Sequence, residues 1–312
     1  MVESKHQWKA WLYLSPAIIL LLVFTVWPII NTLIMAFSNG YSTMGQIGGS
    51  MYEPGIQNFV KVIDYPRFQQ CLKNTILLCV TTVPISTVLA LLIAVALNSI
   101  KPLQKTLQTI FFLPYVTNSI AIGMVFAAMF NIIGLRPDGS QADTWGIINT
   151  VIKAFGGEPV NWINVGSDKW ANMVVMIVYI IWNALPFKIL VLLGGLQSIN
   201  KQYYDAAKVD GTSRTRVFTR ITVPLLSPML AYVIITGFIG GFKEYSSIVG
   251  IFGDKMGPAH DAGRLNTMVG FVYDALEQDF QGRASAAALI LFVIIFLVTQ
   301  FNNLVIKKHV HY

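Results

Sequence analysis

Six long apolar stretches constrain this chain more than any other feature of its sequence. They are approximately Trp11–Phe37, Thr75–Leu97, Thr109–Ile133, Ala171–Leu196, Thr222–Phe242 and Ala284–Ile306. Each is long enough to cross a hydrocarbon layer of ~30 Å as a helix. Only 12% of the 312 residues are charged, against roughly 25% in soluble domains. The sequence therefore predicts an all-α membrane protein with six transmembrane helices.

The first stretch follows a short basic segment that contains Lys5 and Lys9, and it therefore resembles a signal peptide. Its apolar run is longer than the 7–15 residues of a signal peptide's hydrophobic region. We therefore expect an uncleaved membrane helix here.

The connecting segments divide into two sets with different charge. One set comprises the N-terminus, residues 98–108, residues 197–221 and the C-terminal tail; it contains eleven basic residues and three acidic ones. The other set contains about as many acidic as basic residues. Because cytoplasmic segments of membrane proteins are enriched in Lys and Arg, both termini are predicted to be cytoplasmic. The net charge of +7 then indicates topology and contact with anionic lipid, and not nucleic acid.

The segment 197–221 is the most polar of the internal cytoplasmic segments, and its pattern predicts helix, turn, helix. Ser198 or Asn200 can cap the first helix. Gly211 can adopt a positive φ and end that helix, and Ser213 can cap a second one. Apolar residues on one face of so short a loop cannot be buried within it, so the loop is expected to meet a partner surface.

The same segment resembles the signature of permeases from binding-protein-dependent ABC importers. That signature is Glu-Ala-Ala, three residues, Gly, nine residues, Ile-x-Leu-Pro; here Asp205-Ala206-Ala207, Gly211 and Ile221-Thr222-Val223-Pro224 keep the spacing. Pro224 is expected in the first turn of the next span, where its missing N–H does no harm. The resemblance implies that the loop couples to an ATPase through Tyr203, Asp205, Ala206, Ala207, Gly211, Arg214, Phe218, Ile221 and Pro224.

The remainder of the chain resembles the carbohydrate branch of these permeases, the maltose type. Similar stretches include "LYLSPAIILLLVFTVWPIINTLIMAFSN", "FFLPYVTNSIAIGMVFAAMFN" and "GRASAAALILFVIIFLV". The resemblance implies a type I ABC importer permease fold. It also implies a first helix with an external segment over residues 1–70, and a five-helix permease core over residues 71–306 that contains the coupling loop.

The resemblance also implies partners in a bacterial cell membrane. They are a second, homologous permease subunit, two ATPase subunits, an extracytoplasmic solute-binding protein and a sugar. The phosphate-binding pattern G-x-x-x-x-G-K-[ST] occurs nowhere in the sequence. We therefore expect no cofactor in this chain, and we expect ATP and Mg²⁺ to be used by the partner ATPase.

Polar and small residues within the spans are candidates for a substrate path. On the fifth span Gly237, Gly240, Gly241 and Glu244 share one helix face. Trp182, Asn183 and Phe187 lie near the middle of the fourth span, and Tyr115 and Asn118 are weaker candidates in the third. Maltose-type permeases form their pocket from the two helices that flank the signature, at about these offsets. The alternatives are close helix packing for the glycines and an interfacial place for Glu244.

Lys188, about two turns from the inner end of the fourth span, is instead expected to extend its ammonium toward the cytoplasmic interface.

Other functions fit the sequence less well. A permease for a non-sugar solute, such as a glycerol phosphate or a polyamine, would share the mechanism but needs several basic or acidic groups in the pocket. A secondary carrier would show inverted repeats and buried coupling charges. A DNA-reading helix-turn-helix needs a third helix that a loop held at both ends by the membrane does not have. The four histidines have no metal-ligand spacing, and no catalytic residues are predicted.

Overall fold

The structure is a computed structural model that describes residues 7–43, 53–100, 104–131, 134–135, 141–142 and 145–307. Several residues used in the sequence predictions lie outside these ranges, among them Lys5, Lys101, Lys308 and the histidines at 6, 309 and 311. The chain forms two compact units. Unit 1 comprises Met1–Gln69 and Phe271–Phe292, and unit 2 comprises Gln70–Gly270 and Val293–Tyr312. The sequence-based division at residue 70 stays a prediction.

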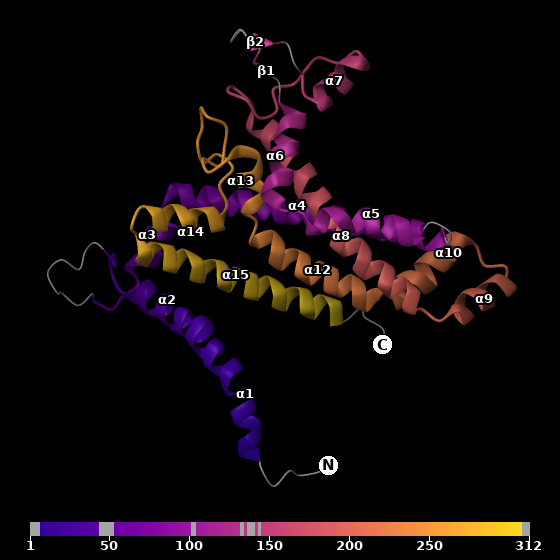
Figure 1. The fold of residues 1–312 in the computed structure, drawn as a ribbon, viewed down its shortest axis with the longest axis horizontal. Coiled ribbons are helices and arrows are strands. Elements are labelled where there is room, and N and C mark those ends of the chain that lie inside the picture. The colour runs from indigo at the N-terminus through magenta and orange to yellow at the C-terminus, as the bar shows by residue number, and fades with distance from the viewer. Residues whose placement is uncertain are drawn as a thin grey trace. The chain divides into compact units, whose positions relative to one another are not determined.

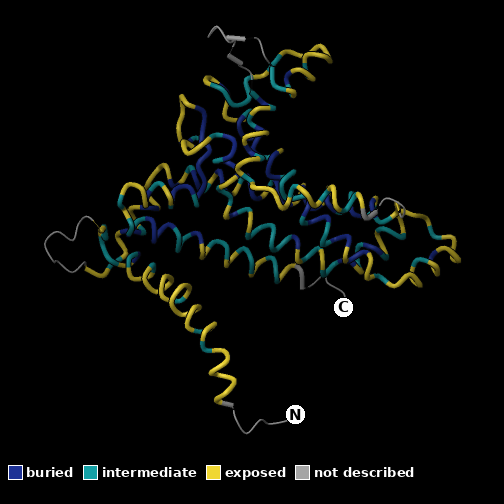
Figure 2. The backbone as a smooth tube through the Cα atoms, in the orientation of Figure 1, coloured by how far each residue is buried: buried dark blue, intermediate teal, exposed yellow. Residues whose placement is uncertain are grey.

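Unit 1 begins with one long apolar helix. It consists of α1 (Gln7–Leu21), the π-helical turn η1 (Leu22–Val26) and α2 (Trp27–Phe37). The short α3 (Gln57–Ile63) follows, and the unit also includes most of α14 (Met268–Glu277) and the first part of α15 (Gln281–Lys307). Figure 2 shows α1 and α2 exposed along almost their whole length. Such apolar exposure is expected of a helix that lies in lipid.

Unit 2 contains the remaining helices, which Figure 1 labels, except that residues 66–69 at the start of α4 belong to unit 1. They are α4 (Pro66–Ser99), α5 (Gln104–Val116), α6 (Ser119–Phe130), α7 (Ile147–Ala154), α8 (Lys169–Ser198), α9 (Lys201–Val209), α10 (Arg214–Val217), η3 (Phe218–Thr222), α11 (Val223–Leu225), α12 (Ser227–Phe242) and α13 (Ser246–Phe252). One short antiparallel pair joins β1 (Gly134–Leu135) to β2 (Gln141–Ala142). The predicted all-α membrane fold is confirmed.

Among the described residues, four helices are long and apolar enough to cross a membrane without a break. They are Trp8–Phe37, Pro66–Ser99, Lys169–Ser198 and Gln281–Val305. The count reaches six if each of two bent helix pairs forms one span. The third and fifth predicted spans are each a bent pair of helices.

The bend in the third span is 97° and separates α5 from α6. Asn118 lies between them in an extended conformation, and its side-chain oxygen accepts from the backbone N–H groups of Ile120 and Ala121. This is an N-cap, which starts a new helix and does not continue the old one.

The bend in the fifth span is 67° and lies at Leu226. Pro228 stands in the first turn of α12, and a proline ring clashes with the carbonyl four residues before it in a continuous helix. Pro224 lies in the first turn of the short α11, before the bend. The helix α12 ends at Phe242, the predicted end of the fifth span, and α13 starts as a separate helix at Ser246.

Candidate transport site and coupling loop

A cavity of about 280 Å³ lies within unit 2, between α4, α5, α8 and α12. Its volume is close to the lower end of the range for small-molecule pockets, about 300 Å³. The lining residues are Thr82, Val83, Ser86, Tyr115, Ile180, Asn183, Ala184, Phe187, Lys188, Thr236, Gly237, Gly240, Gly241 and Glu244. The structure thus brings together seven of the nine residues proposed for a substrate path.

Asn183 and Glu244 are two of the polar residues that line this cavity, and they come from distant parts of the chain. Asn183 comes from the middle of α8, and Glu244 comes from just beyond the end of α12. The Glu244 carboxylate accepts a hydrogen bond of 3.2 Å from the backbone N–H of Ser247, in the first turn of α13. The Glu244 backbone carbonyl accepts one of 2.7 Å from the Thr267 hydroxyl. The carboxylate is therefore held in place although no helix continues through it.

Aromatic rings line one side of the cavity. The rings of Tyr115 and Phe187 are stacked, with centroids 5.7 Å apart and planes inclined by 21°. Phe187 also meets Tyr232 at 6.3 Å. An amide and a carboxylate beside flat apolar faces form a surface that can hold hydroxyl groups and C–H faces together.

Two of the three glycines of α12 pack closely against α4, and the third borders open space. A methyl group built on Gly241 would lie 2.8 Å from the sulfur of Cys79, and one on Gly237 would lie 3.1 Å from a methyl of Val83. A methyl group on Gly240 would meet no atom within 4 Å. Close packing on α4 therefore explains Gly237 and Gly241, while Gly240 leaves room in the cavity.

Lys188 does not extend toward the interface, and that prediction was wrong. Its side chain is 4% exposed. Its ammonium donates to the Val83 carbonyl at 3.1 Å, the Ser86 hydroxyl at 2.7 Å and the Thr87 hydroxyl at 2.9 Å. An ammonium has three donors, so α4 accepts all of them. Polar groups of α4 thus stabilise the Lys188 ammonium inside the spanning region. The Lys188 side chain therefore does not extend to the aqueous interface.

Two of the proposed pocket residues lie elsewhere in unit 2. The Trp182 ring packs on Phe126 of α6, with centroids 5.2 Å apart, and belongs to the edge of an apolar core cluster. Asn118 caps α6 at the bend described above. Neither residue lines the cavity.

Sequence reasoning missed the contribution of α4 to the cavity. Thr82 and Ser86 lie on either side of Pro84 in the stretch "TTVPIST", together with Thr87. A cluster of hydroxyls around a proline inside an apolar span is itself a polar intramembrane feature. The hydroxyl cluster could have been found in the sequence. Its partner, Lys188, is about 100 residues away and could not be inferred from the cluster.

The coupling loop has the predicted helix–turn–helix form, and Figure 1 shows α9 and α10 between the end of α8 and the start of α12. Asn200 caps α9 by accepting from the backbone N–H of Gln202 at 2.9 Å. Gly211 has φ +65°, as predicted. Ser213 occupies the N-cap position of α10, but its side chain makes no cap hydrogen bond, so the expected cap was wrong.

The loop is tied to the membrane helices on one side and exposed on the other. The Tyr204 hydroxyl lies 3.3 Å from that of Thr222, and Ala207 is buried. On α9, Tyr203 is 54% exposed and Val209 is 90% exposed. Figure 2 shows most of α9 in the exposed colour.

Spanning helices with a partly polar cavity between them define a multi-pass membrane protein of the transport class. The chain belongs to the family of inner membrane components of binding-protein-dependent transport systems, whose model matches residues 86–310. As such a component, it is a bacterial membrane protein that works with a binding protein and further subunits.

Relatives and solved structures resemble the chain over nearly its full length. A lactose transport system permease of Rhizobium radiobacter is 30% identical over 95% of this chain and 92% of its own. An arabinooligosaccharides permease of Halalkalibacterium halodurans is 29% identical over 92% of this chain and 84% of its own. The fold resembles a chain of a bacterial ABC transporter for the acidic polysaccharide alginate, with a TM-score of 0.76 and 23% identity, covering 97% of this chain and 96% of that one.

Proposed function

We propose that this chain is one permease half of an ATP-driven sugar importer and that its solute is a neutral mono- or oligosaccharide. The observation that carries this proposal is the cavity in which Asn183 and Glu244 lie beside the stacked rings of Tyr115 and Phe187. The names of the lactose and arabinooligosaccharide relatives support the choice of a sugar.

The hydrogen bonds of Lys188 support a neutral solute over an anionic one. All three ammonium donors are bound by Val83, Ser86 and Thr87, so none remains for a carboxylate or phosphate on the solute. A neutral sugar needs hydroxyl partners, which Asn183 and Glu244 supply.

The coupling loop is proposed to dock on a separate ATPase subunit. The exposed residues Tyr203 and Val209 supply apolar contact, and Arg214 supplies charge at the edge. The buried Ala207 and the turn at Gly211 fix the angle between α9 and α10. In this proposal two ATPase subunits bind ATP and Mg²⁺, and this chain has no catalytic role and holds no cofactor.

The complex proposed here also contains a second, homologous permease and an extracytoplasmic binding protein. An excess of basic over acidic residues supports a topology with both termini and the coupling loop in the cytoplasm. This excess lies in the N-terminal segment, residues 98–108, residues 197–221 and the C-terminal tail. The opposite ends of the spans then face the binding protein.

The test is to purify the intact complex through a tag on this chain, identify its subunits and bound solute, and measure ATP-dependent uptake of labelled sugars in vesicles. Glu244→Ala and Asn183→Ala each remove a hydrogen-bonding group that lines the cavity. A lost hydrogen bond to a charged group, as at Glu244, weakens binding by about 10- to 150-fold, and a lost neutral one, as at Asn183, by roughly 2- to 10-fold. We expect lower uptake rates for both variants, and unchanged capture of sugar by the binding protein.

Glu277→Ala is the matched control, because Glu277 is exposed and does not line the cavity. Transport of every sugar at the parental rate by both cavity variants would assign these residues to packing. An intact complex that carries no sugar and takes up another solute would contradict the substrate class.

A further inference from the structure

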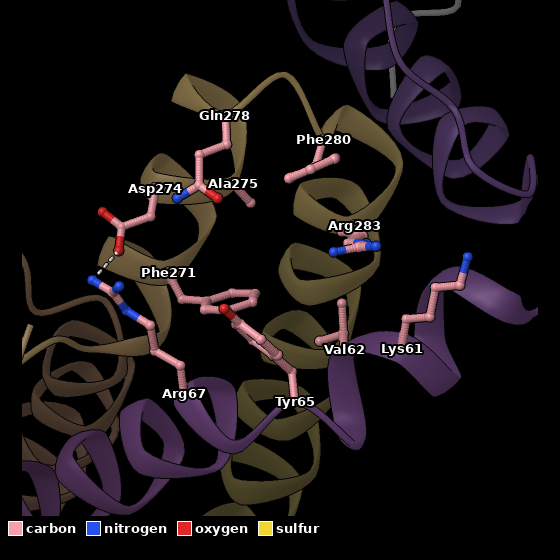
Figure 3. A pocket seen from close by; sticks show the side chains of 10 residues that line it. All are labelled: Lys61, Val62, Tyr65, Arg67, Phe271, Asp274, Ala275, Gln278, Phe280 and Arg283. Carbon is pink, nitrogen blue, oxygen red and sulfur yellow. Dashed lines mark hydrogen bonds and ion pairs between the residues drawn. The ribbon is translucent and has the colours of Figure 1, made fainter. Parts of the chain in front are cut away.

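A second cavity, of about 40 Å³, lies within unit 1, among α3, the start of α4, α14 and the start of α15. It holds about three water-sized atoms, which is room for a small group and not for a sugar unit. Its floor is apolar, because Val62, Phe271 and Ala275 are buried. Figure 3 shows the Tyr65 hydroxyl and the Arg283 guanidinium among the groups around it, with Lys61 at the edge.

Basic side chains outnumber acidic ones around this cavity. Lys61, Arg67 and Arg283 line it, with Asp274 as the lining carboxylate. Asp274 pairs with Arg67 at 3.1 Å, as the dashed line in Figure 3 shows. In the part of the chain that the structure describes, no carboxylate lies within salt-bridge distance of Lys61 or Arg283. Two positive charges therefore remain unbalanced at one small cavity.

The Arg283 guanidinium is held in a defined position. It lies over the ring of Phe280, 4.6 Å from the centroid, a cation–π contact that orients the planar group. The Tyr65 hydroxyl and the Gln278 amide are further hydrogen-bond donors in the lining. Oriented donors with an excess of positive charge suit an oxyanion.

The position of Arg283 in the sequence places the cavity at membrane headgroup level. Arg283 directly precedes the apolar run of α15 that begins at Ala284. Tyr65 and Phe280 are large exposed side chains, and such aromatic rings gather at the membrane–water interface. Ile63 and Leu276, next in sequence to lining residues, are exposed apolar side chains. Apolar exposure beside a cationic cavity fits a lipid better than a carboxylate on a soluble partner.

We propose that this cavity binds the phosphate of an anionic phospholipid, with Arg283 as the principal contact and Lys61 at its rim. The acyl chains lie along the exposed apolar residues of unit 1. The only part of this proposal that depends on the topology proposed above is the membrane leaflet that supplies the lipid. With both termini in the cytoplasm, it is the outer leaflet. Failure of the sugar-importer proposal would leave this site unaffected.

The test counts phospholipids retained by the purified full-length chain in native mass spectrometry, with phosphatidylglycerol and phosphatidylcholine supplied in turn. One basic residue near an anionic lipid surface changes binding by about fivefold. Arg283→Gln should weaken phosphatidylglycerol binding at least that much, while Arg283→Lys keeps most of it. Lys169→Gln is the matched control, because Lys169 is exposed at the first position of the spanning helix α8 and does not line the cavity.

Several results would overturn the proposal. One is equal retention of phosphatidylglycerol by Arg283→Gln and the control, and another is equal retention of the two lipids by the parent. Displacement by excess inorganic phosphate would identify a free anion as the ligand. Weaker association with the binding protein at unchanged lipid retention would identify a protein carboxylate. If Arg283→Gln does not fold, Lys61→Gln at the exposed rim replaces it, with a smaller loss expected.

Discussion

The contact between Gly241 of α12 and Cys79 of α4 gives a sharp test of how the cavity is built. A methyl group added at Gly241 would lie 2.8 Å from the Cys79 sulfur and 3.4 Å from its Cβ. The first distance is too short for van der Waals contact, so α12 or the cysteine must move. Overpacking of this kind destabilises by about 1–3 kcal/mol. In a chain of this size each kcal/mol lowers Tm by about 1.5 °C.

The measurement is the Tm of the purified full-length chain for three variants. Gly241→Ala should lower Tm. Gly240→Ala, one residue earlier on the same helix, should lower it little, since a methyl group there meets no atom within 4 Å. Adding Cys79→Ala to Gly241→Ala removes the sulfur and leaves only the 3.4 Å contact. The double variant should therefore recover part of the loss, a coupling that we expect to reach about 0.5–3 kcal/mol.

Equal Tm values for Gly240→Ala and Gly241→Ala would refute the reasoning, because they would mean that α12 does not pack on α4 through Gly241. Absence of any recovery in the double variant would show that the cysteine is not the group in the way. Sugar uptake by Gly240→Ala is a separate readout. A methyl group in open cavity space should change solute selectivity without changing Tm.

Two further predictions concern the coupling loop and the buried lysine. Gly211 has φ +65° and free space around it, so Gly211→Val should add roughly 1–2 kcal/mol of backbone strain and reduce ATP-dependent uptake more than Gly211→Asn; full uptake by the valine variant would contradict the coupling role. Lys188→Met should leave Tm unchanged or higher, because Ser86 and Thr87 still donate to carbonyls of α4 and apolar replacement of a buried charge is often neutral or stabilising. A large fall in Tm would instead show that the lysine holds α8 to α4.

Local features of the sequence determined the class of the molecule and the form of the coupling loop. Long apolar runs are predicted as spanning helices from composition alone, because a helix needs about 20 consecutive apolar residues to cross the hydrocarbon layer. The turn at Gly211 and the cap at Asn200 were also predictable, because each depends on residues close in the chain. The helix face that carries Gly237, Gly240 and Gly241 was predicted from periodicity alone, and all three line the cavity.

Contacts between distant segments decided the rest. Lys188 finds its partners on α4, about 100 residues away, and no pattern around the lysine itself could distinguish that arrangement from an extended side chain at the interface. Trp182 and Asn183 are neighbours in sequence, yet one packs on α6 and the other faces the cavity. Adjacent residues on a helix point about 100° apart, so only the placement of the neighbouring helices determines which of them meets a solute.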